Sequence, residues 1–252
     1  MLSSQRKSEI LDRVSRTGTV VGAELAEEWN VSEDTIRRDL RELAAQGAIQ
    51  RVHGGAVRVS PAAADYATRT NVATDAKVAV ARAAVVLIEP GQTVFLDGGT
   101  TTREMCRAFP DALAATVVTH SPTVAVELVD KPSIDVLLIG GTLHRHSLVS
   151  VGAVALEYIN AVAVDTFFLG VSGVHPEQGL TTGDAEEAAI KRAISRRASD
   201  TYVLASSEKI GAALPHRVVE VGDVVGAITD HTDAATLAQL EAAGLPMIAA
   251  RS

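Results

Sequence analysis

One stretch of the sequence combines glycines and hydroxyls in a way that suits a phosphate. The apolar run TVFL at 93–96 precedes Asp97, Gly98, Gly99, Thr100, Thr101 and Thr102, and a helical pattern follows them. Glycines let a backbone approach a ligand closely, hydroxyls donate hydrogen bonds, and the free N–H groups of a helix start favour an anion. A glycine turn between a strand and a helix also occurs without a ligand, but three successive threonines favour a phosphate site.

Two lysines could supply the positive charge of such a site. Lys191 and Lys209 each lie near a predicted strand or loop end, where they could help to neutralise a phosphate. Lys191 also follows Glu187 by four positions, and such a pair stabilises a helix without any ligand. Glu187 is the obvious general base if the site instead removes a proton from a substrate carbon.

Other polar groups follow predicted strands. His120 ends the run TVVTH, and Gly140 and Gly141 end the run DVLLIGG. His144 and His146 come next and could suggest a metal. No cysteine or carboxylate stands nearby at ligand spacing, however, and two histidines do not complete a tetrahedral site. We therefore expect no metal and no other cofactor.

A second group of functional residues lies on a short helical segment, 31–43. Ile36, Leu40 and Leu43 fall on one face of a helix and would be buried together. Ser32 is placed to cap the amino end. The opposite face carries groups that suit insertion into a DNA major groove, namely Thr35, Arg37, Arg38 and Arg41. An ordinary surface helix with a charged face would show the same pattern.

The neighbouring segments predict the elements that position this helix. A first helix should begin at Ser3 or Ser4 and end near Gly18, and a second should cover 23–29. Residues 48–59 surround a glycine pair and predict a hairpin. Three short helices and a hairpin form the outline of a winged helix-turn-helix. Arg51 and His53 would lie on the wing beside backbone phosphates, although a lone histidine in a turn is more often a surface residue.

Composition narrows the class of protein. Of 252 residues, 47% are hydrophobic and 21% charged, as in folded globular proteins. The net charge of −8 lies outside residues 1–60, which hold nine Lys or Arg and nine Asp or Glu. A neutral domain should bind DNA weakly, so we expect a homo-oligomer, either a dimer or a tetramer. We also expect a cytoplasmic protein without a membrane partner, because Cys106 is the only cysteine and neither a signal peptide nor a long apolar run is present.

The rest of the chain predicts a second domain. Residues 58–73 show no clear period and suggest a hinge. A helix should start at Asp75, and strands and helices then alternate, which predicts an α/β domain with a largely parallel, buried sheet. Ligands of such sheets bind beyond the carboxyl ends of the strands. The predicted strands are 93–97, 116–120, 135–141, 165–171, 201–206, 224–229 and 246–250, and the later helices are 101–109, 122–129, 152–160, 185–198 and 233–243.

Several strings resemble the DeoR family of bacterial transcriptional regulators. In the first 57 residues these are TIRRDL at 35–40 and RVHGGA at 51–56. The resemblance implies that Ser32, Thr35, Arg37 and Arg38 belong to a DNA-reading helix. Farther along, LDGGTTT, VVTHS, LLIGGT, DTFFLGVSGV, GLTT, EAAIK, SSEK and AITD resemble, in this order, the effector-binding domain of the same family.

That domain in turn is similar to sugar-phosphate isomerases of the ribose-5-phosphate isomerase type. The resemblance implies a phosphorylated sugar bound by Asp97, Gly99, Thr100, Thr101, Thr102, Lys191 and Lys209. Two positions differ from the family's pattern, since Ser206 replaces an aspartate and His120 an asparagine. Both would lie near the ligand, so the preferred sugar should differ from that of better-known members.

These observations predict a sequence-specific transcriptional regulator. We expect a winged helix-turn-helix at 1–58, a linker at 59–74, and an α/β sensing and oligomerisation domain at 75–252. Its partners would be operator double-stranded DNA and a phosphorylated sugar, and the regulated genes would serve carbohydrate transport or catabolism, most often under repression. The alternatives are a sugar-phosphate isomerase with an appended DNA-binding module and an architectural DNA binder with a degenerate pocket.

Overall fold

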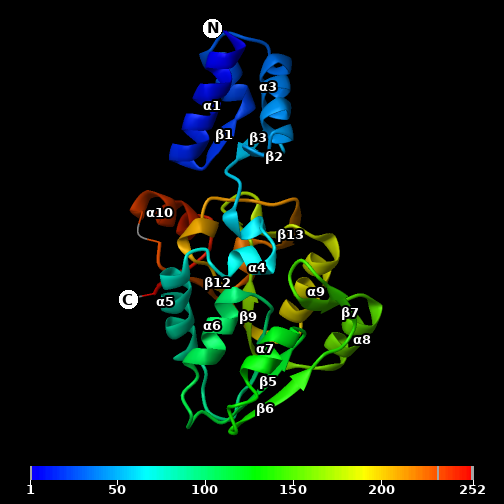
Figure 1. Cartoon of the computed structure of the whole chain (residues 1–252). Coiled ribbons are helices and arrows are strands. Elements are labelled where there is room, and N and C mark those ends of the chain that lie inside the picture. The colour runs from blue at the N-terminus through cyan, green and yellow to red at the C-terminus, as the bar shows by residue number, and fades with distance from the viewer. Residues whose placement is uncertain (1, 232, 251–252) are drawn as a thin grey trace.

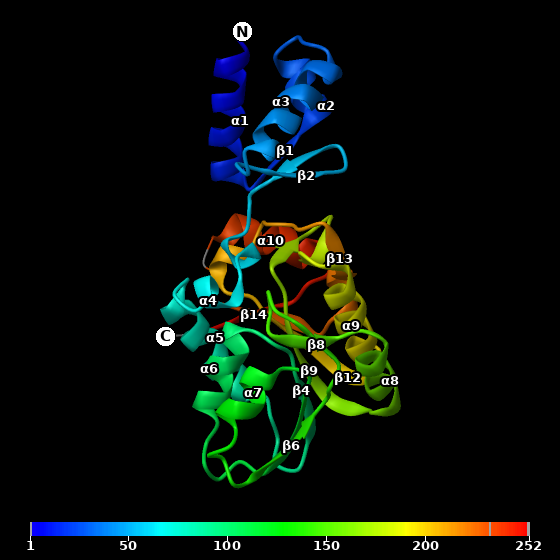
Figure 2. The same cartoon turned by 45° about the vertical axis from the view of Figure 1, so that its right-hand side comes forward.

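The computed structural model describes residues 2–231 and 233–250. It contains a small domain that ends at β3 and a larger α/β domain that begins after it (Figure 1). A single stretch of chain, residues 58–60, leads from one to the other (Figure 2).

The small domain is a three-helix unit with a three-stranded antiparallel sheet. Ile10, Leu25, Ile36, Leu40 and Leu43 form the centre of its core, as the spacing of apolar residues predicts. The predicted hairpin is confirmed, but a short strand before the second helix adds to it, giving the order β1-β3-β2. The elements are α1 (Ser3–Thr17), β1 (Thr19–Val21), α2 (Gly22–Glu28), α3 (Glu33–Ala45), β2 (Gln50–Val52) and β3 (Gly55–Val57).

A buried ion pair joins the first and third helices. Arg6 Nε lies 2.7 Å from Asp39 Oδ2, and the Asp39 side chain is 1% exposed. Ser3 Oγ donates to the other carboxylate oxygen of Asp39 at 3.2 Å. Because removing one partner of a buried pair leaves an uncompensated charge, this contact fixes the packing of α1 against α3.

The larger domain is built on a seven-stranded sheet in the order β15-β14-β12-β9-β4-β5-β6. Every neighbouring pair is parallel, and the seven strands coincide with the seven predicted ones, so the predicted α/β architecture is confirmed. The strands are β4 (Thr93–Leu96), β5 (Ala115–Thr119), β6 (Ile134–Leu138), β9 (Val164–Gly170), β12 (Ala198–Leu204), β14 (Gly226–Thr229) and β15 (Met247–Ala249).

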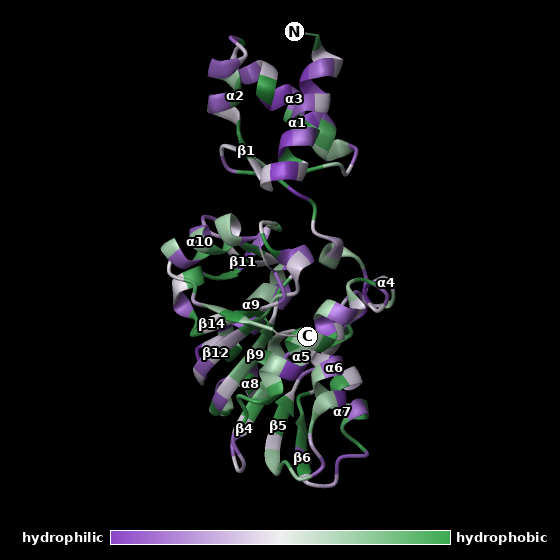
Figure 3. Ribbon diagram, turned by 90° about the vertical axis from the view of Figure 1, so that its left-hand side faces the viewer, coloured by the Kyte–Doolittle hydropathy of each residue, from purple (hydrophilic) through white to green (hydrophobic). Residues whose placement is uncertain are grey.

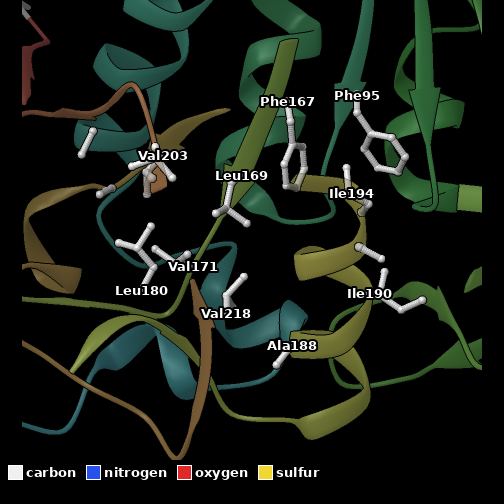
Figure 4. Close-up of a cluster of buried hydrophobic side chains, with 14 of the residues drawn as sticks. Phe95, Phe167, Leu169, Val171, Leu180, Ala188, Ile190, Ile194, Val203 and Val218 are labelled. Atoms are coloured by element: carbon white, nitrogen blue, oxygen red, sulfur yellow. The ribbon is translucent and has the colours of Figure 1, made fainter. Parts of the chain in front are cut away.

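Helices cover both faces of this sheet. One core joins Val94 and Leu96 of β4 to α5 (Thr74–Val85), α6 (Thr100–Ala108) and α7 (Pro122–Glu127). The other joins Phe95 to α8 (Ala153–Ala161), α9 (Ala185–Ser195) and α10 (Ala234–Ala242). Phe95 and Phe167 of neighbouring strands lie close to Ile190 and Ile194 of α9 (Figure 4). Alternate side chains of each strand therefore enter opposite cores, which gives three layers with hydrophobic strands in the middle (Figure 3).

Several short elements escaped the sequence-based prediction. β7 (Thr142–His144) pairs with β8 (Val149–Val151), and β10 (Gly173–His175), β11 (Gly179–Thr182) and β13 (His216–Val219) form a small antiparallel sheet. The predicted hinge also contains structure, namely a 3₁₀ helix, Pro61–Ala63, and α4 (Tyr66–Arg69). Side chains cap both of them, because Ser60 Oγ accepts from the Ala62 N–H and Asp65 Oδ1 from the Thr68 N–H.

Strand β6 lies at one edge of the sheet and has no partner on its outer side among the residues described. Its apolar side chains are poorly covered, with Val136, Leu137 and Leu138 exposed by 39%, 48% and 47%. An exposed apolar edge strand is a surface on which another chain can pair.

Candidate functional site

The start of α3 is fixed as its sequence predicts. Ser32 Oγ accepts from the Thr35 N–H at 3.3 Å, and the two hydroxyl oxygens lie 2.9 Å apart. Ser32 is exposed and Thr35 half-buried, so the capped end of the helix faces solvent. This end of α3 is the part of a recognition helix that contacts base edges in helix-turn-helix proteins.

One arginine of α3 and two residues of the wing meet at one groove. Arg37, Arg51 and His53 line a hollow of about 530 Å³ between α3 and the turn that joins β2 to β3. Arg37 is engaged on its own helix, 2.7 Å from Glu33 and 3.2 Å from Asp34. Arg38 and Arg41 are exposed, and neither forms an ion pair within residues 2–231 and 233–250. The front of α3 therefore keeps two guanidinium groups free for an external partner.

The larger domain has a cavity at the carboxyl end of β4, where Thr100, Thr101 and Thr102 begin α6. The turn before them requires glycine. Gly99 has φ +142°, and a Cβ at Gly98 would stand 2.1 Å from Val149 Cγ1. The cavity wall also includes Arg69, Val72, Lys77, Gly170, Ser172, Glu187, Lys191, Glu208 and Lys209.

Asp97 lies behind this wall and is completely buried. Its carboxylate accepts from Lys191 Nζ at 2.5 Å and from the Gly98 and Gly170 N–H groups at 2.8 Å each. His120 Nε2 lies 2.9 Å from the same carboxylate. Burial by itself raises the pKa of Asp97, but the Lys191 charge and the contact with His120 outweigh it and lower the pKa. Asp97 is thus a fixed negative charge that positions Lys191.

Lys191 is neutralised from two sides. Besides Asp97, it pairs with Glu187 Oε1 at 3.2 Å. Burial lowers the pKa of Lys191, but the two carboxylates outweigh it and raise the pKa. Glu187 accepts from Ser147 Oγ at 2.7 Å and lies 3.6 Å from His144 Nδ1. Burial raises the pKa of Glu187, and Lys191, His144 and Ser147 more than reverse that shift.

Three other cations of the wall lack such compensation. Lys209 Nζ donates to the Leu204 carbonyl at 3.0 Å, and Lys77 Nζ donates to the Arg69 carbonyl at 2.5 Å. Burial lowers the pKa of Lys209 to about 8, against the charge of Glu208 and with help from nearby Arg69, Lys77 and Lys191. Burial also lowers the pKa of Lys77 and of Arg69. A buried cluster of positive charge beside hydroxyls and a helix start is suited to hold an anion.

The cavity continues into a larger one. The space at the threonine turn is about 20 Å³, enough for a water molecule. The adjoining space measures about 340 Å³ and is bounded by His144, His146, Ser147, Thr182 and Asp184. Ala62, Arg69, Ser172 and Glu187 border both spaces. The larger space can receive a polar body, whereas the space at the threonine turn must widen to receive a phosphate-sized anion.

The structure brings most of the predicted effector residues together. Gly98, Gly99, Thr100, Thr101, Thr102, Lys191 and Lys209 line the cavity. Asp97 and His120 stand behind it and hold Lys191 in place. Gly141 is absent from both walls, because it packs where a Cβ would meet the Val151 carbonyl oxygen at 2.8 Å. Because Gly141 has no side chain, the chain that follows β6 can pass close to β8.

Three residues of the cavity wall are not predicted from the sequence, namely Arg69, Lys77 and Glu208. Lys77 carried a usable signal, because it is the one cation within the apolar run AKVAVA and is 4% exposed in the structure. A lysine on the buried face of a helix calls for a local anion or a ligand. Arg69 carried no such signal, because the segment around it has no clear period.

Among the residues described, no group of three or more His, Cys, Asp or Glu is arranged to hold a metal ion. Within the same ranges, no helix is long and apolar enough to cross a membrane.

Comparisons with known proteins follow the same two-domain division. Residues 6–62 match the DeoR-like helix-turn-helix domain, and residues 72–231 match the DeoR C-terminal sensor domain. The HTH-type transcriptional regulator GlpR of Haloferax volcanii is 35% identical over 98% of each chain. The glycerol-3-phosphate regulon repressor of Escherichia coli K12 is 32% identical over 93% of this chain and 92% of its own. A solved ribose 5-phosphate isomerase from Methanocaldococcus jannaschii aligns with 56% of this chain and 55% of its own, at 18% identity and a TM-score of 0.41.

Proposed function

Because the chain belongs to the DeoR family of transcriptional regulators, we propose that it represses a carbohydrate transport or catabolism operon under the control of a phosphorylated sugar. The observation that supports a sugar phosphate as the effector is the cavity at the carboxyl end of β4. Its buried cations Lys77 and Lys209 stand beside three threonine hydroxyls at the start of α6, where a phosphate can be held.

The chain is a transcriptional regulator and not a sugar-phosphate isomerase. The geometry around Glu187 agrees, because a general base needs a carboxylate whose pKa lies near the working pH. Lys191, Ser147 and His144 occupy this carboxylate and lower its pKa. Glu187 therefore serves to hold charge in place.

In this proposal the phosphate and the sugar occupy different ends of the cavity. The phosphate lies at the threonine turn, which widens to admit it, with Lys77 and Lys209, whose pKa values burial lowers despite the charge of Glu208. The sugar body extends into the adjoining space of about 340 Å³, which is the size of a small-molecule site. Ser147 and Asp184 stand there as partners for hydroxyls.

DNA binding is assigned to residues 1–58, and sensing and oligomerisation to 75–252. The start of α3 would enter the major groove with Ser32, Thr35, Arg38 and Arg41, while Arg37, Arg51 and His53 face the adjoining backbone. Because residues 1–60 carry no net charge, two or more copies must act together on the operator. The exposed apolar edge of β6 offers a second copy a strand to pair with. Such a regulator works in the cytoplasm, beside the chromosome.

The test measures operator binding by the purified full chain. Fluorescence anisotropy with the promoter of its own operon should give specific binding that weakens with salt. Glycerol 3-phosphate and phosphorylated hexoses and pentoses are then titrated in, with the unphosphorylated sugars as matched controls. One sugar phosphate should change the operator affinity about 5–150-fold. Absence of binding at low salt, with and without each compound, would falsify the proposal.

A further inference from the structure

The segment that leads out of the DNA-binding domain forms one wall of the cavity. Ala62, Arg69 and Val72 all line it, although they precede α5, the first helix that packs on the seven-stranded sheet. The segment is held on the far side by the turn between β7 and β8, where the Tyr66 N–H donates to the His146 carbonyl at 2.9 Å and His146 Nε2 lies 3.1 Å from the Ala63 carbonyl. It is therefore a docked part of the sensor domain.

Arg69 brings an unpaired charge into this cavity. Its Nε and Nη2 atoms are buried and have no hydrogen-bond partner in the parts of the chain that the structure describes. The guanidinium carbon lies 5.9 Å from the centre of the Tyr66 ring, and Arg69 borders both spaces of the cavity. A largely buried guanidinium that forms no ion pair with the described residues is costly even with the charge of Glu187 nearby, and a phosphoryl group matches its planar fork of donors.

We propose that Arg69 is the anchor that closes the anion site, so that a bound phosphoryl group fastens the segment 60–72 onto the sensor domain. The anion is held between Arg69 on one wall and Lys209 with the threonine turn on the other. Because this segment connects the sensor to the DNA-binding domain, the free energy of anion binding is linked to the position of that domain.

A second contact joins the Lys209 wall to the DNA-binding domain. Arg58, at the end of the wing, donates from its N–H to the Gly18 carbonyl at 2.9 Å and from Nη2 to the Ile210 carbonyl at 2.7 Å. Ile210 directly follows Lys209. An anion that draws Lys209 and Arg69 together therefore acts on the segment that leads to the small domain (Figure 2) and on the stretch of the sensor that Arg58 contacts. The role of the anion as an effector rests on the proposed function, whereas its binding at Arg69 does not.

The test uses the full chain, inorganic phosphate as the probe, and the variants Arg69→Gln and Arg69→Lys. The matched control is Arg82→Gln, an exposed arginine on α5. Without phosphate, Arg69→Gln should melt at the same temperature as the unchanged chain or higher, because it removes a buried unpaired charge. Phosphate should raise the melting temperature of the unchanged chain and of Arg82→Gln. Arg69→Gln should bind phosphate about tenfold more weakly or worse, with Arg69→Lys in between.

Hydrogen exchange locates the effect. Phosphate should slow amide exchange in residues 61–72 of the unchanged chain and leave these amides unaffected in Arg69→Gln. Equal stabilisation by phosphate in Arg69→Gln and the unchanged chain, or unchanged exchange in 61–72, overturns the inference. A melting temperature that falls without phosphate assigns Arg69 a structural role and also overturns it. Operator binding is measured separately, so a chain that binds phosphate and ignores DNA contradicts only the proposed function.

Discussion

The two domains use positive charge in opposite ways. On α3, Arg38 and Arg41 are exposed and Arg37 shares its charge with carboxylates of its own helix. In the sensor domain, Lys77, Lys191 and Lys209 are 4%, 3% and 6% exposed. Exposed arginines contribute little to the fold and can exchange water for DNA at small cost. Buried lysines depend on nearby anions, so these cations affect the stability of the sensor domain and, in the proposed function, also its choice of ligand.

The largest difference between the regions should be in stability. Lys191→Met leaves Asp97 and Glu187 buried without their cation, so the free energy of unfolding should fall by about 3–5 kcal/mol. Arg37→Met removes an exposed, solvent-screened pair and should cost about 0–1 kcal/mol. Urea unfolding followed by circular dichroism measures both. Equal losses would remove the contrast between the two regions.

The next effect concerns the DNA-binding face. Arg38→Ala should weaken operator binding by about 1–3 kcal/mol if its guanidinium contacts a base. Unfolding should hardly change, because Arg38 is exposed and forms no ion pair with the residues described. Anisotropy titrations with the operator and with a scrambled duplex measure the loss. Arg82→Ala on α5 is the control, and unchanged operator binding by Arg38→Ala would exclude Arg38 from the interface.

The third effect is the pH dependence of the sensor. The pKa of Lys209 is lowered to about 8, so this lysine is charged below pH 8 and loses its proton above it. A phosphate monoester is already a dianion in that range. Effector affinity should therefore fall as the pH rises through about 8, by up to about tenfold per pH unit. Calorimetric titrations on both sides of pH 8 measure the fall. In Lys209→Gln the effector affinity should not change with pH over this range. A steep fall in that variant would show that another group is the one that titrates.

The smallest effect tests one hydroxyl. Thr101→Val keeps the shape of the side chain but removes a donor from the cavity wall, where Thr101 is 5% exposed. Effector binding should weaken by about 0.5–1.5 kcal/mol. Thr101→Ser retains the hydroxyl and should bind almost normally. If the two variants bind alike, the hydroxyl makes no contact with the effector.

The sequence predicted the scaffold better than the site. Apolar periodicity found α3 and all seven strands of the parallel sheet, because buried faces leave a regular pattern in the chain. β7, β8 and β10 were missed, since three-residue strands are too short to show a period. The structure in 61–69 was missed as well, because it is held by capping side chains and by contacts with His146.

The ends of the predicted strands indicated where the cavity lies, but not which residues line it and which lie behind it or pack elsewhere. Thr100, Lys191 and Lys209 meet at one cavity as expected. Gly141 follows a strand of the same sheet, yet it packs against β8, and His120 lies behind Asp97. Arg69 and Lys209 are 140 positions apart in the sequence, and only the three-dimensional fold puts both of them on the cavity wall.

Cys106, the single cysteine, can serve as a chemical probe for the opening of α6. It lies in the last turn of α6, is 0% exposed, and burial raises the pKa of its thiol to about 12. Alkylation requires the thiolate, so the reagent can act only when α6 opens. Since α6 starts at the threonine turn, a ligand that binds there and stabilises the helix should slow the alkylation of Cys106.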